Sequence, residues 1–76
     1  MNPDEIAVVM NVLGERVMST TEILKEFHPD YDSWDHGMKR REENRIYRRL
    51  KYMANNDYIR IVGKVAKTNE AIWSVV

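Results

Sequence analysis

Apolar residues near the start of the chain recur with the spacing of one helix face. Asn2 can cap such a helix, because Pro3 follows it and the carboxylate of Glu5 comes three residues after the cap. Gly14 is placed to end the helix with a left-handed residue. The pattern therefore predicts a helix over residues 3–13. Its apolar face is formed by Ile6, Val9, Met10 and Leu13.

A second, shorter helix is predicted after a brief extended segment at residues 16–18. Ser19 and Glu22 have the spacing of a capping box, in which each satisfies a backbone N–H of the other. Pro29 ends this helix, since the residue before a proline is pushed out of helical geometry. We therefore predict a helix over residues 20–27. Residues 28–38 are rich in Asp, Ser, Pro and Gly and are expected to form a loop with room for one helical turn.

The longest predicted helix covers residues 39–55, which contain neither glycine nor proline. Ile46, Leu50 and Met53 form its apolar stripe, and Tyr47 and Ala54 flank that stripe. Asn56 and Asp57 are suited to the C-terminal cap and exit from the helix.

The last part of the chain alternates between apolar and polar residues, which is typical of β-strands. Ile59, Ile61 and Val65 share one parity of the predicted strand 58–65, and Arg60, Val62 and Lys64 share the other. Residues 66–70 form a loop and residues 71–76 a returning strand, so we expect a hairpin packed on the helices. The fold class is thus α+β, with three helices, a short first strand and a C-terminal hairpin.

This order of elements resembles that of the winged-helix domains, which belong to the helix-turn-helix class. The residues that carry the resemblance run from Asn44 to Arg60, NRIYRRLKYMANNDYIR, and are similar to a recognition helix that leads into a wing. The chain departs from the pattern where about ten residues separate Phe27 from the third helix, because a helix-turn-helix has a turn of three or four. The resemblance implies a single DNA-binding domain over residues 1–76, with the third helix in the major groove.

Charge is distributed unevenly along the chain. Its 76 residues include 12 basic and 12 acidic side chains, so the net charge is zero, and 43% of the residues are hydrophobic. Residues 1–38 nevertheless carry a net charge of −6, and residues 39–76 carry +6. Such asymmetry indicates nucleic-acid binding, although a solvated charged helix would have the same composition. A chain of this length makes one small domain with little room for an enclosed catalytic pocket.

The predicted face opposite the apolar stripe of residues 39–55 is rich in arginine, asparagine and tyrosine. Arginine can pair with guanine and asparagine with adenine in the major groove. The candidate base-reading residues are Arg41, Asn44, Arg45 and Arg48, with Tyr52 beside them. Residues nearer the flanks are candidates for phosphate contacts, namely Lys39, Arg40, Arg49 and Lys51. The resemblance adds the hairpin-loop residues Lys64, Lys67, Thr68 and Asn69.

Together these observations predict a sequence-specific double-stranded DNA-binding protein, a transcriptional regulator of the repressor type. Most such proteins dimerise, and we expect a homodimer through the first helix, with Val8 and Val12 as contacts, or through the loop 28–38. The alternative is a winged-helix protein-interaction module that uses the acidic N-terminal half and that loop. One subgroup of winged helices binds left-handed nucleic acid, and Asn44 matches its pattern. That subgroup has a tyrosine where this chain has Arg48, so B-form DNA is expected.

Other classes of function have little support in the sequence. The chain has no cysteine, hence no disulfide and no thiolate metal site. His28, Asp30, Asp32, Asp35 and His36 lack the spacing of a calcium or zinc site. We therefore expect no metal, no cofactor, no small-molecule ligand and no enzymatic activity. No apolar stretch is long enough for a membrane span and no signal sequence opens the chain, so a cytoplasmic protein is expected.

Overall fold

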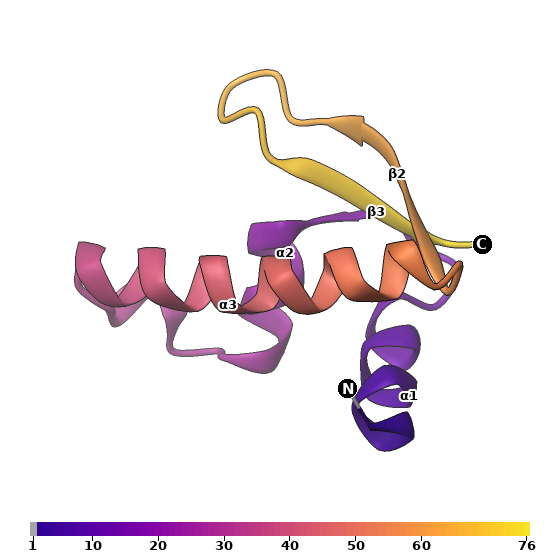
Figure 1. Ribbon diagram of the computed structural model, residues 1–76. Coiled ribbons are helices and arrows are strands. Elements are labelled where there is room, and N and C mark those ends of the chain that lie inside the picture. The colour runs from indigo at the N-terminus through magenta and orange to yellow at the C-terminus, as the bar shows by residue number, and fades with distance from the viewer. Residues whose placement is uncertain (1) are drawn as a thin grey trace.

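Three helices and a three-stranded antiparallel sheet make up the fold, which is α+β as predicted (Figure 1). The computed structural model describes residues 2–76. The elements in chain order are α1 Pro3–Leu13, β1 Met18–Ser19, α2 Thr20–Phe27, the 3-10 helix η1 Tyr31–Ser33, α3 His36–Asn55, β2 Ile59–Lys64 and β3 Ala71–Val75.

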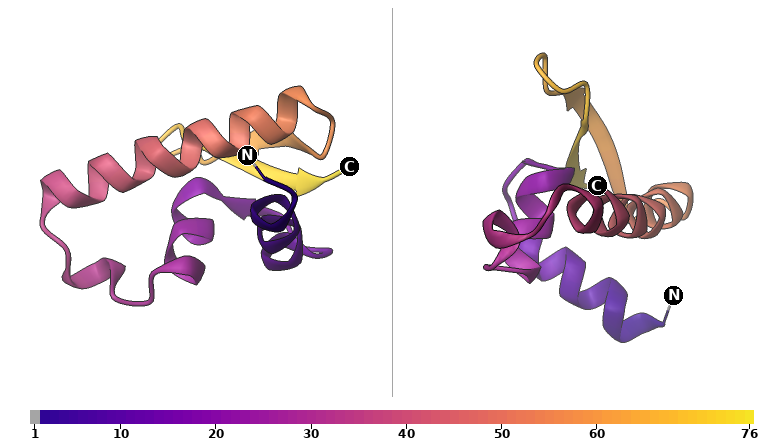
Figure 2. Two further views of the ribbon diagram at one scale, coloured as in Figure 1. Left: turned by 60° about the horizontal axis from the view of Figure 1, so that its bottom comes forward. Right: turned by 90° about the vertical axis from the view of Figure 1, so that its left-hand side faces the viewer.

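The sheet brings the short first strand against the end of the chain. Its strand order is β1-β3-β2, so β3 lies in the middle and pairs with both neighbours. Trp73 of β3 is paired with Met18 of β1 on one side and with Ile61 of β2 on the other. The β2–β3 hairpin rises on one side of α3, and α1 lies on the opposite side (Figures 1 and 2). The helix α3 therefore has a flank toward the hairpin and a flank toward α1.

The predicted starts of α1 and α2 are confirmed by their hydrogen bonds. The Glu5 backbone N–H donates to Asn2 Oδ1 at 2.9 Å, and the capping box of Ser19 and Glu22 is complete, at 3.1 and 3.2 Å. Gly14 ends α1 with a positive φ of 53°, where a side chain would be strained, although its ψ of −128° lies outside the left-handed helical region. Local capping chemistry thus sets the bounds of α1 and α2.

The apolar stripes of the three helices meet over the sheet. Ile46, Leu50 and Met53 of α3 are buried, as their spacing predicts. The side chains that are almost completely buried come from every layer of the fold, namely Trp73, Leu13, Ile23, Leu24, Leu50, Met53 and Ile59. This core fixes α3 on the sheet and leaves the far side of α3 in solvent.

The helix α3 begins three residues earlier than predicted, at His36 instead of Lys39. Asp35 causes the difference, because its side chain accepts a hydrogen bond from the Met38 backbone N–H at 2.8 Å and so caps the helix. Gly37 costs about 1 kcal/mol relative to alanine in a helix, which is similar to what such a cap contributes. The loop predicted at residues 28–38 therefore ends at Asp35, and it does contain one helical turn, η1.

The simple alternation predicted for β2 is wrong beyond its first residues. Ile59 is buried, but Ile61 is 42% exposed and Val62 is 46% exposed. The register with β3 shifts between Ile61 and Gly63, which is the mark of a β-bulge. A bulge turns the side chains after it to the other face, so it changes the parity only beyond Ile61. Ile61 itself lies on the face of Ile59 and is exposed because it lines an open groove between the hairpin and α3.

The aromatic side chains of the loop between α2 and α3 pack on one another. The Trp34 ring centroid lies 5.0 Å from that of His28 and 5.6 Å from that of Tyr31, and Trp34 Nε1 donates to Asp30 at 3.0 Å. Tyr31 is buried and its hydroxyl donates to Glu43 of α3 at 2.6 Å. The loop is thus tied to α3 by its own side chains.

Replacing Tyr31 with Phe is expected to lower the free energy of unfolding by about 1 kcal/mol at neutral pH, the usual contribution of one hydrogen bond. The hydrogen bond to Glu43, burial and the Glu43 charge raise the pKa of Tyr31 from 10.0 to about 12. A raised pKa gives stability that is present below pH 10.0 and is lost as the pH rises toward about 12. Urea unfolding of both proteins should therefore show their difference shrinking across that window. A constant difference would contradict the assignment.

Candidate nucleic-acid interface

Five polar residues of α3 form a continuous exposed stripe on the side away from the core. They recur every three or four residues, so successive members stand above one another on the helix. All five are exposed. This outer stripe consists of Arg41, Asn44, Arg48, Lys51 and Asn55. Three of the five are cationic and two carry amides, the combination that arginine–guanine, asparagine–adenine and phosphate contacts require.

The cations of the outer stripe have no acidic partner. The ion pairs within residues 2–76 are Arg16 with Glu26, Lys25 with Asp32, and Arg45 with Glu42. Arg41, Arg48 and Lys51 take part in none of them. Their mutual repulsion is therefore uncompensated within the described part of the chain, and a polyanion would relieve it.

The hairpin contributes to a groove beside the outer stripe. Asn44 lines this hairpin groove of about 380 Å³ together with Tyr47 of α3, Lys64 of β2 and Asn69 of the hairpin loop. The remaining lining comes from the α2 start, α3 and the strands, namely Thr20, Thr21, Glu43, Ile61, Glu70 and Ala71. The fold thus brings together three predicted site residues that are distant in sequence.

Tyr47 is a site residue that the sequence prediction assigned only to the edge of the core. Its side chain is 41% exposed, and its ring meets the Trp73 ring edge-on with centroids 5.9 Å apart. Trp73 is itself held by a hydrogen bond from Nε1 to Thr20 Oγ1 at 2.9 Å. Tyr47 therefore presents an oriented aromatic surface in the hairpin groove. Its position about 100° from the apolar stripe was the available signal.

Several predicted site residues lie elsewhere. Arg45 and Arg49 line a different groove, on the flank of α3 toward α1, and Tyr52 is exposed but belongs to neither groove. Lys39 is half-buried, with its ammonium 5.1 Å from the Tyr31 ring centroid. Arg40 is exposed near the N-terminal end of α3, where it lines a small hollow with Lys39. The basic residues of α3 are therefore divided among three surfaces.

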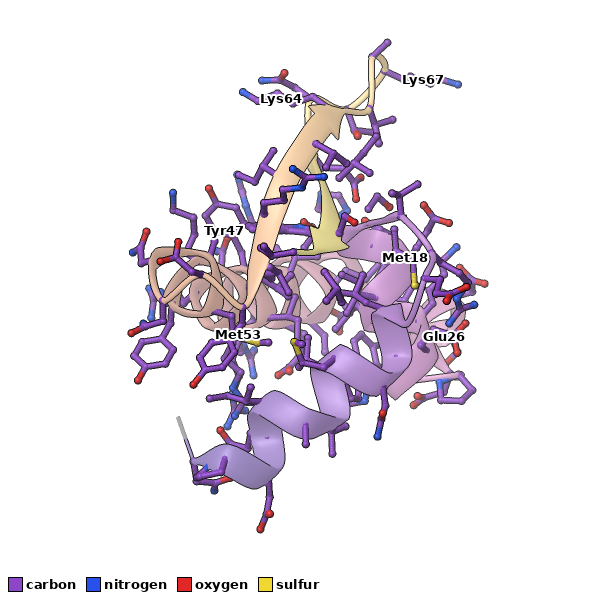
Figure 3. All side chains as sticks on the ribbon, turned by 90° about the vertical axis from the view of Figure 1, so that its right-hand side faces the viewer. Met18, Glu26, Tyr47, Met53, Lys64 and Lys67 are labelled. Carbon is purple, nitrogen blue, oxygen red and sulfur yellow. The ribbon has the colours of Figure 1, made fainter. Side chains whose placement is uncertain are left out.

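The hairpin loop is a closed turn whose two lysines point apart. The Val65 N–H donates to Glu70 O at 2.9 Å, and the Asn69 N–H donates to Val65 O at 2.7 Å. Lys64 and Lys67 leave opposite sides of the hairpin, and Lys64 lies on the side of Tyr47 (Figure 3). Of the two lysines, Lys64 is therefore better placed to act together with α3.

Glu70 joins the hairpin to the start of α2. Its carboxylate accepts from the Thr21 backbone N–H at 2.7 Å and from Thr68 Oγ1 at 2.9 Å. Burial raises the pKa of Glu70, but the hydrogen bonds from Thr21 and Thr68 outweigh it, and the pKa is lowered from 4.5. Thr68 is thus engaged in holding the loop, which leaves Lys64 and Asn69 as the free polar side chains toward the groove.

Replacing Glu70 with Gln is expected to lower the free energy of unfolding by about 1–2 kcal/mol at neutral pH, because the hydrogen bonds lose their charged acceptor and become weaker neutral ones. A lowered pKa gives stability that is present above 4.5 and is lost as the pH falls below it. The difference from the natural protein should therefore close in acid. Thermal unfolding at a series of pH values tests this. Glu15→Gln, a change of the same kind at an exposed residue just after α1, is the control.

Comparison with known protein families, characterised proteins and solved structures finds no match for this chain. Within residues 2–76, no three His, Cys, Asp or Glu side chains are grouped so that they could hold a metal ion. In the same residues no helix combines the length and apolar character that crossing a bilayer requires. The outer stripe and the hairpin groove are therefore the features of residues 2–76 that bear on the function.

Proposed function

We propose that this chain is a winged-helix domain that binds double-stranded DNA and serves as a sequence-specific transcriptional regulator. The observation that carries the proposal is the outer stripe of α3, whose cations are exposed, unpaired within residues 2–76 and adjacent to the hairpin groove. In this proposal α3 is the recognition helix and the β2–β3 hairpin is the wing.

The outer stripe has the dimensions and chemistry for the major groove. An α-helix with its side chains is about 10–12 Å across, and the groove of B-form DNA is about 12 Å wide. We assign Arg41, Asn44 and Arg48 to base edges and Lys51 to phosphate. Lys64 then contacts the phosphate backbone of the DNA beside the major groove, because Lys64 projects from the hairpin on the side of α3.

Titration of a random-sequence duplex at several salt concentrations tests the proposal. If the domain neutralises around five phosphates, the logarithm of affinity should fall with the logarithm of salt with a slope near −4 to −5. Selection from a random duplex pool should then enrich a defined site. Absence of any duplex binding at low salt would overturn the proposal and favour the protein-interaction alternative.

Tyr47 supports a second candidate, recognition of left-handed DNA. The winged helices that bind this form combine an asparagine and a tyrosine on the third helix with a late tryptophan. Here Tyr47 lies edge-on to Trp73 and shares the hairpin groove with Asn44, although it is one position earlier than in that pattern. Circular dichroism of an alternating dC-dG duplex separates the two candidates. Inversion of the duplex spectrum on adding protein supports the left-handed form, and an unchanged spectrum with binding supports B-form DNA.

A further inference from the structure

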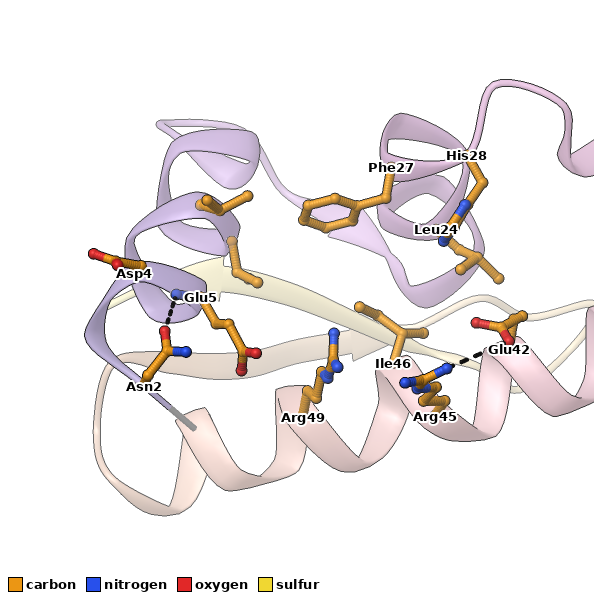
Figure 4. Close-up of a pocket in the computed structure, with 12 residues that line it drawn as sticks. Asn2, Asp4, Glu5, Leu24, Phe27, His28, Glu42, Arg45, Ile46 and Arg49 are labelled. Atoms are coloured by element: carbon orange, nitrogen blue, oxygen red, sulfur yellow. Dashed lines mark hydrogen bonds and ion pairs between the residues drawn. The ribbon is translucent and has the colours of Figure 1, made fainter.

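A second groove lies on the flank of α3 that faces away from the hairpin. It has a volume of about 510 Å³ and runs between α1, the end of α2 and α3 (Figure 4). Its apolar lining comes from Val8, Val9, Leu24, Phe27 and Ile46. Val8 is 48% exposed and stands on the α1 wall, so this α1–α3 groove leaves apolar surface in solvent. Such surface beside charged residues is typical of an interface.

The two walls of the α1–α3 groove carry opposite charges. Asp4 and Glu5 stand on the α1 wall, and Arg45 and Arg49 stand on the α3 wall (Figure 4). Arg45 makes only a long ion pair of 3.9 Å with Glu42, and Arg49 makes none among residues 2–76. The basic wall can therefore accept carboxylates from another molecule.

We propose that the α1–α3 groove is occupied by α1 of a second copy of this chain. The helix α1 carries what the groove accepts, since Asp4 and Glu5 in its first turn lie near the exposed Val8. In the complex, Val8 of each copy covers the apolar floor of the other, and the acidic first turn meets Arg45 and Arg49. The acidic α1 wall of one copy can face the basic α3 wall of the other. In a two-fold symmetric dimer each such contact occurs twice.

The other predicted dimer surface, the loop between α2 and α3, borders a hollow of about 230 Å³, which is smaller than the α1–α3 groove. Trp34 packs against His28 and Tyr31 and donates to Asp30. Lys25 pairs with Asp32 of the same loop at 3.5 Å. The aromatic and charged groups of the loop are therefore satisfied within one chain. The dimer contact is assigned to α1 for this reason.

Dimer formation leaves the proposed DNA surface free. Arg45 and Arg49 belong to the flank of α3 toward α1, and Tyr47 belongs to the flank toward the hairpin. The outer stripe lies between them. Self-association is therefore a property separate from DNA binding, and it can be measured without DNA.

Sedimentation equilibrium of the full chain, without DNA, tests the proposal. The natural protein should dimerise, and Val8→Arg should weaken dimerisation at least about tenfold by placing a bulky cation on the apolar floor. Val17→Arg is the matched control, because Val17 is 60% exposed and lies outside the groove. Far-UV circular dichroism confirms that both variants are folded.

Reversing the charges of Glu5 and Arg49 tests whether these two side chains pair across the dimer. Arg49→Glu and Glu5→Lys should each weaken the homodimer about tenfold or more, and mixing the two variants should restore association through the reversed pair. Arg48→Glu on the outer stripe should leave dimerisation unchanged. A protein that stays monomeric up to about 1 mM would overturn the proposal. A dimer indifferent to Val8→Arg and to the charge exchange would also overturn it, since its interface would lie elsewhere.

Discussion

Replacing Arg48 and Lys51 together with alanine should weaken binding to duplex DNA about fifty-fold near 0.1 M salt. Both side chains are exposed on the outer stripe, three residues apart, and neither has an acidic partner in residues 2–76. Losing the phosphate contact of Lys51 should remove about 0.9 from the slope of log affinity against log salt. Because Arg48 is assigned to a base edge, binding to the selected site should weaken more than binding to random duplex.

Arg16→Ala with Lys25→Ala is the matched control for this prediction. It removes the same two positive charges, but from residues that already pair with Glu26 and Asp32 and lie outside the outer stripe and the hairpin groove. Fluorescence anisotropy with one labelled duplex measures all three proteins over a salt series. Equal losses in the two double variants would show that only total charge matters, and the assignment of α3 as the recognition helix would fail.

Local signals in the sequence predict most of the secondary structure. Asn2, Ser19 and Gly14 act on backbone groups within a few residues, so the bounds of α1 and α2 follow from spacing alone. The start of α3 is predicted too late because Gly37 and the preceding turn-forming residues indicate a loop. In the structure the Asp35 side chain caps the helix, which therefore begins at His36. The bulge in β2 was missed because it depends on how that strand pairs with β3.

The candidate site is only partly readable from helix periodicity. The spacing separates the buried Ile46 from the exposed Arg48, but it does not say which flank of α3 faces α1 and which faces the hairpin. Long-range packing settles that, and it places Arg49 in the α1–α3 groove and Tyr47 in the hairpin groove. The predicted cluster of cations is therefore divided among three surfaces, and the proposed DNA-binding face and the proposed contact between copies lie on two of them.

Replacing Trp73 with alanine should destabilise the domain more than any other single change. Trp73 is fully buried in the central strand, pairs in register with Met18 and Ile61, and supports Tyr47 with its ring. Removing a buried aromatic side chain costs about 3–5 kcal/mol, a large part of the 5–15 kcal/mol that stabilises a typical domain. Urea unfolding followed by far-UV circular dichroism should show this loss as a much lower midpoint.

Trp73→Phe separates the packing of the ring from its hydrogen bond. The variant keeps an aromatic ring in β3 but leaves Thr20 Oγ1 without its donor, which should cost about 1–3 kcal/mol. Thr20→Ala should cost less when made in Trp73→Phe than in the natural protein, because the two changes remove the same bond. Additive losses would contradict that coupling. Since Tyr47 rests edge-on against Trp73, the Phe variant should also bind duplex DNA more weakly if the oriented tyrosine contributes to the interface, and unchanged binding would assign Tyr47 to packing alone.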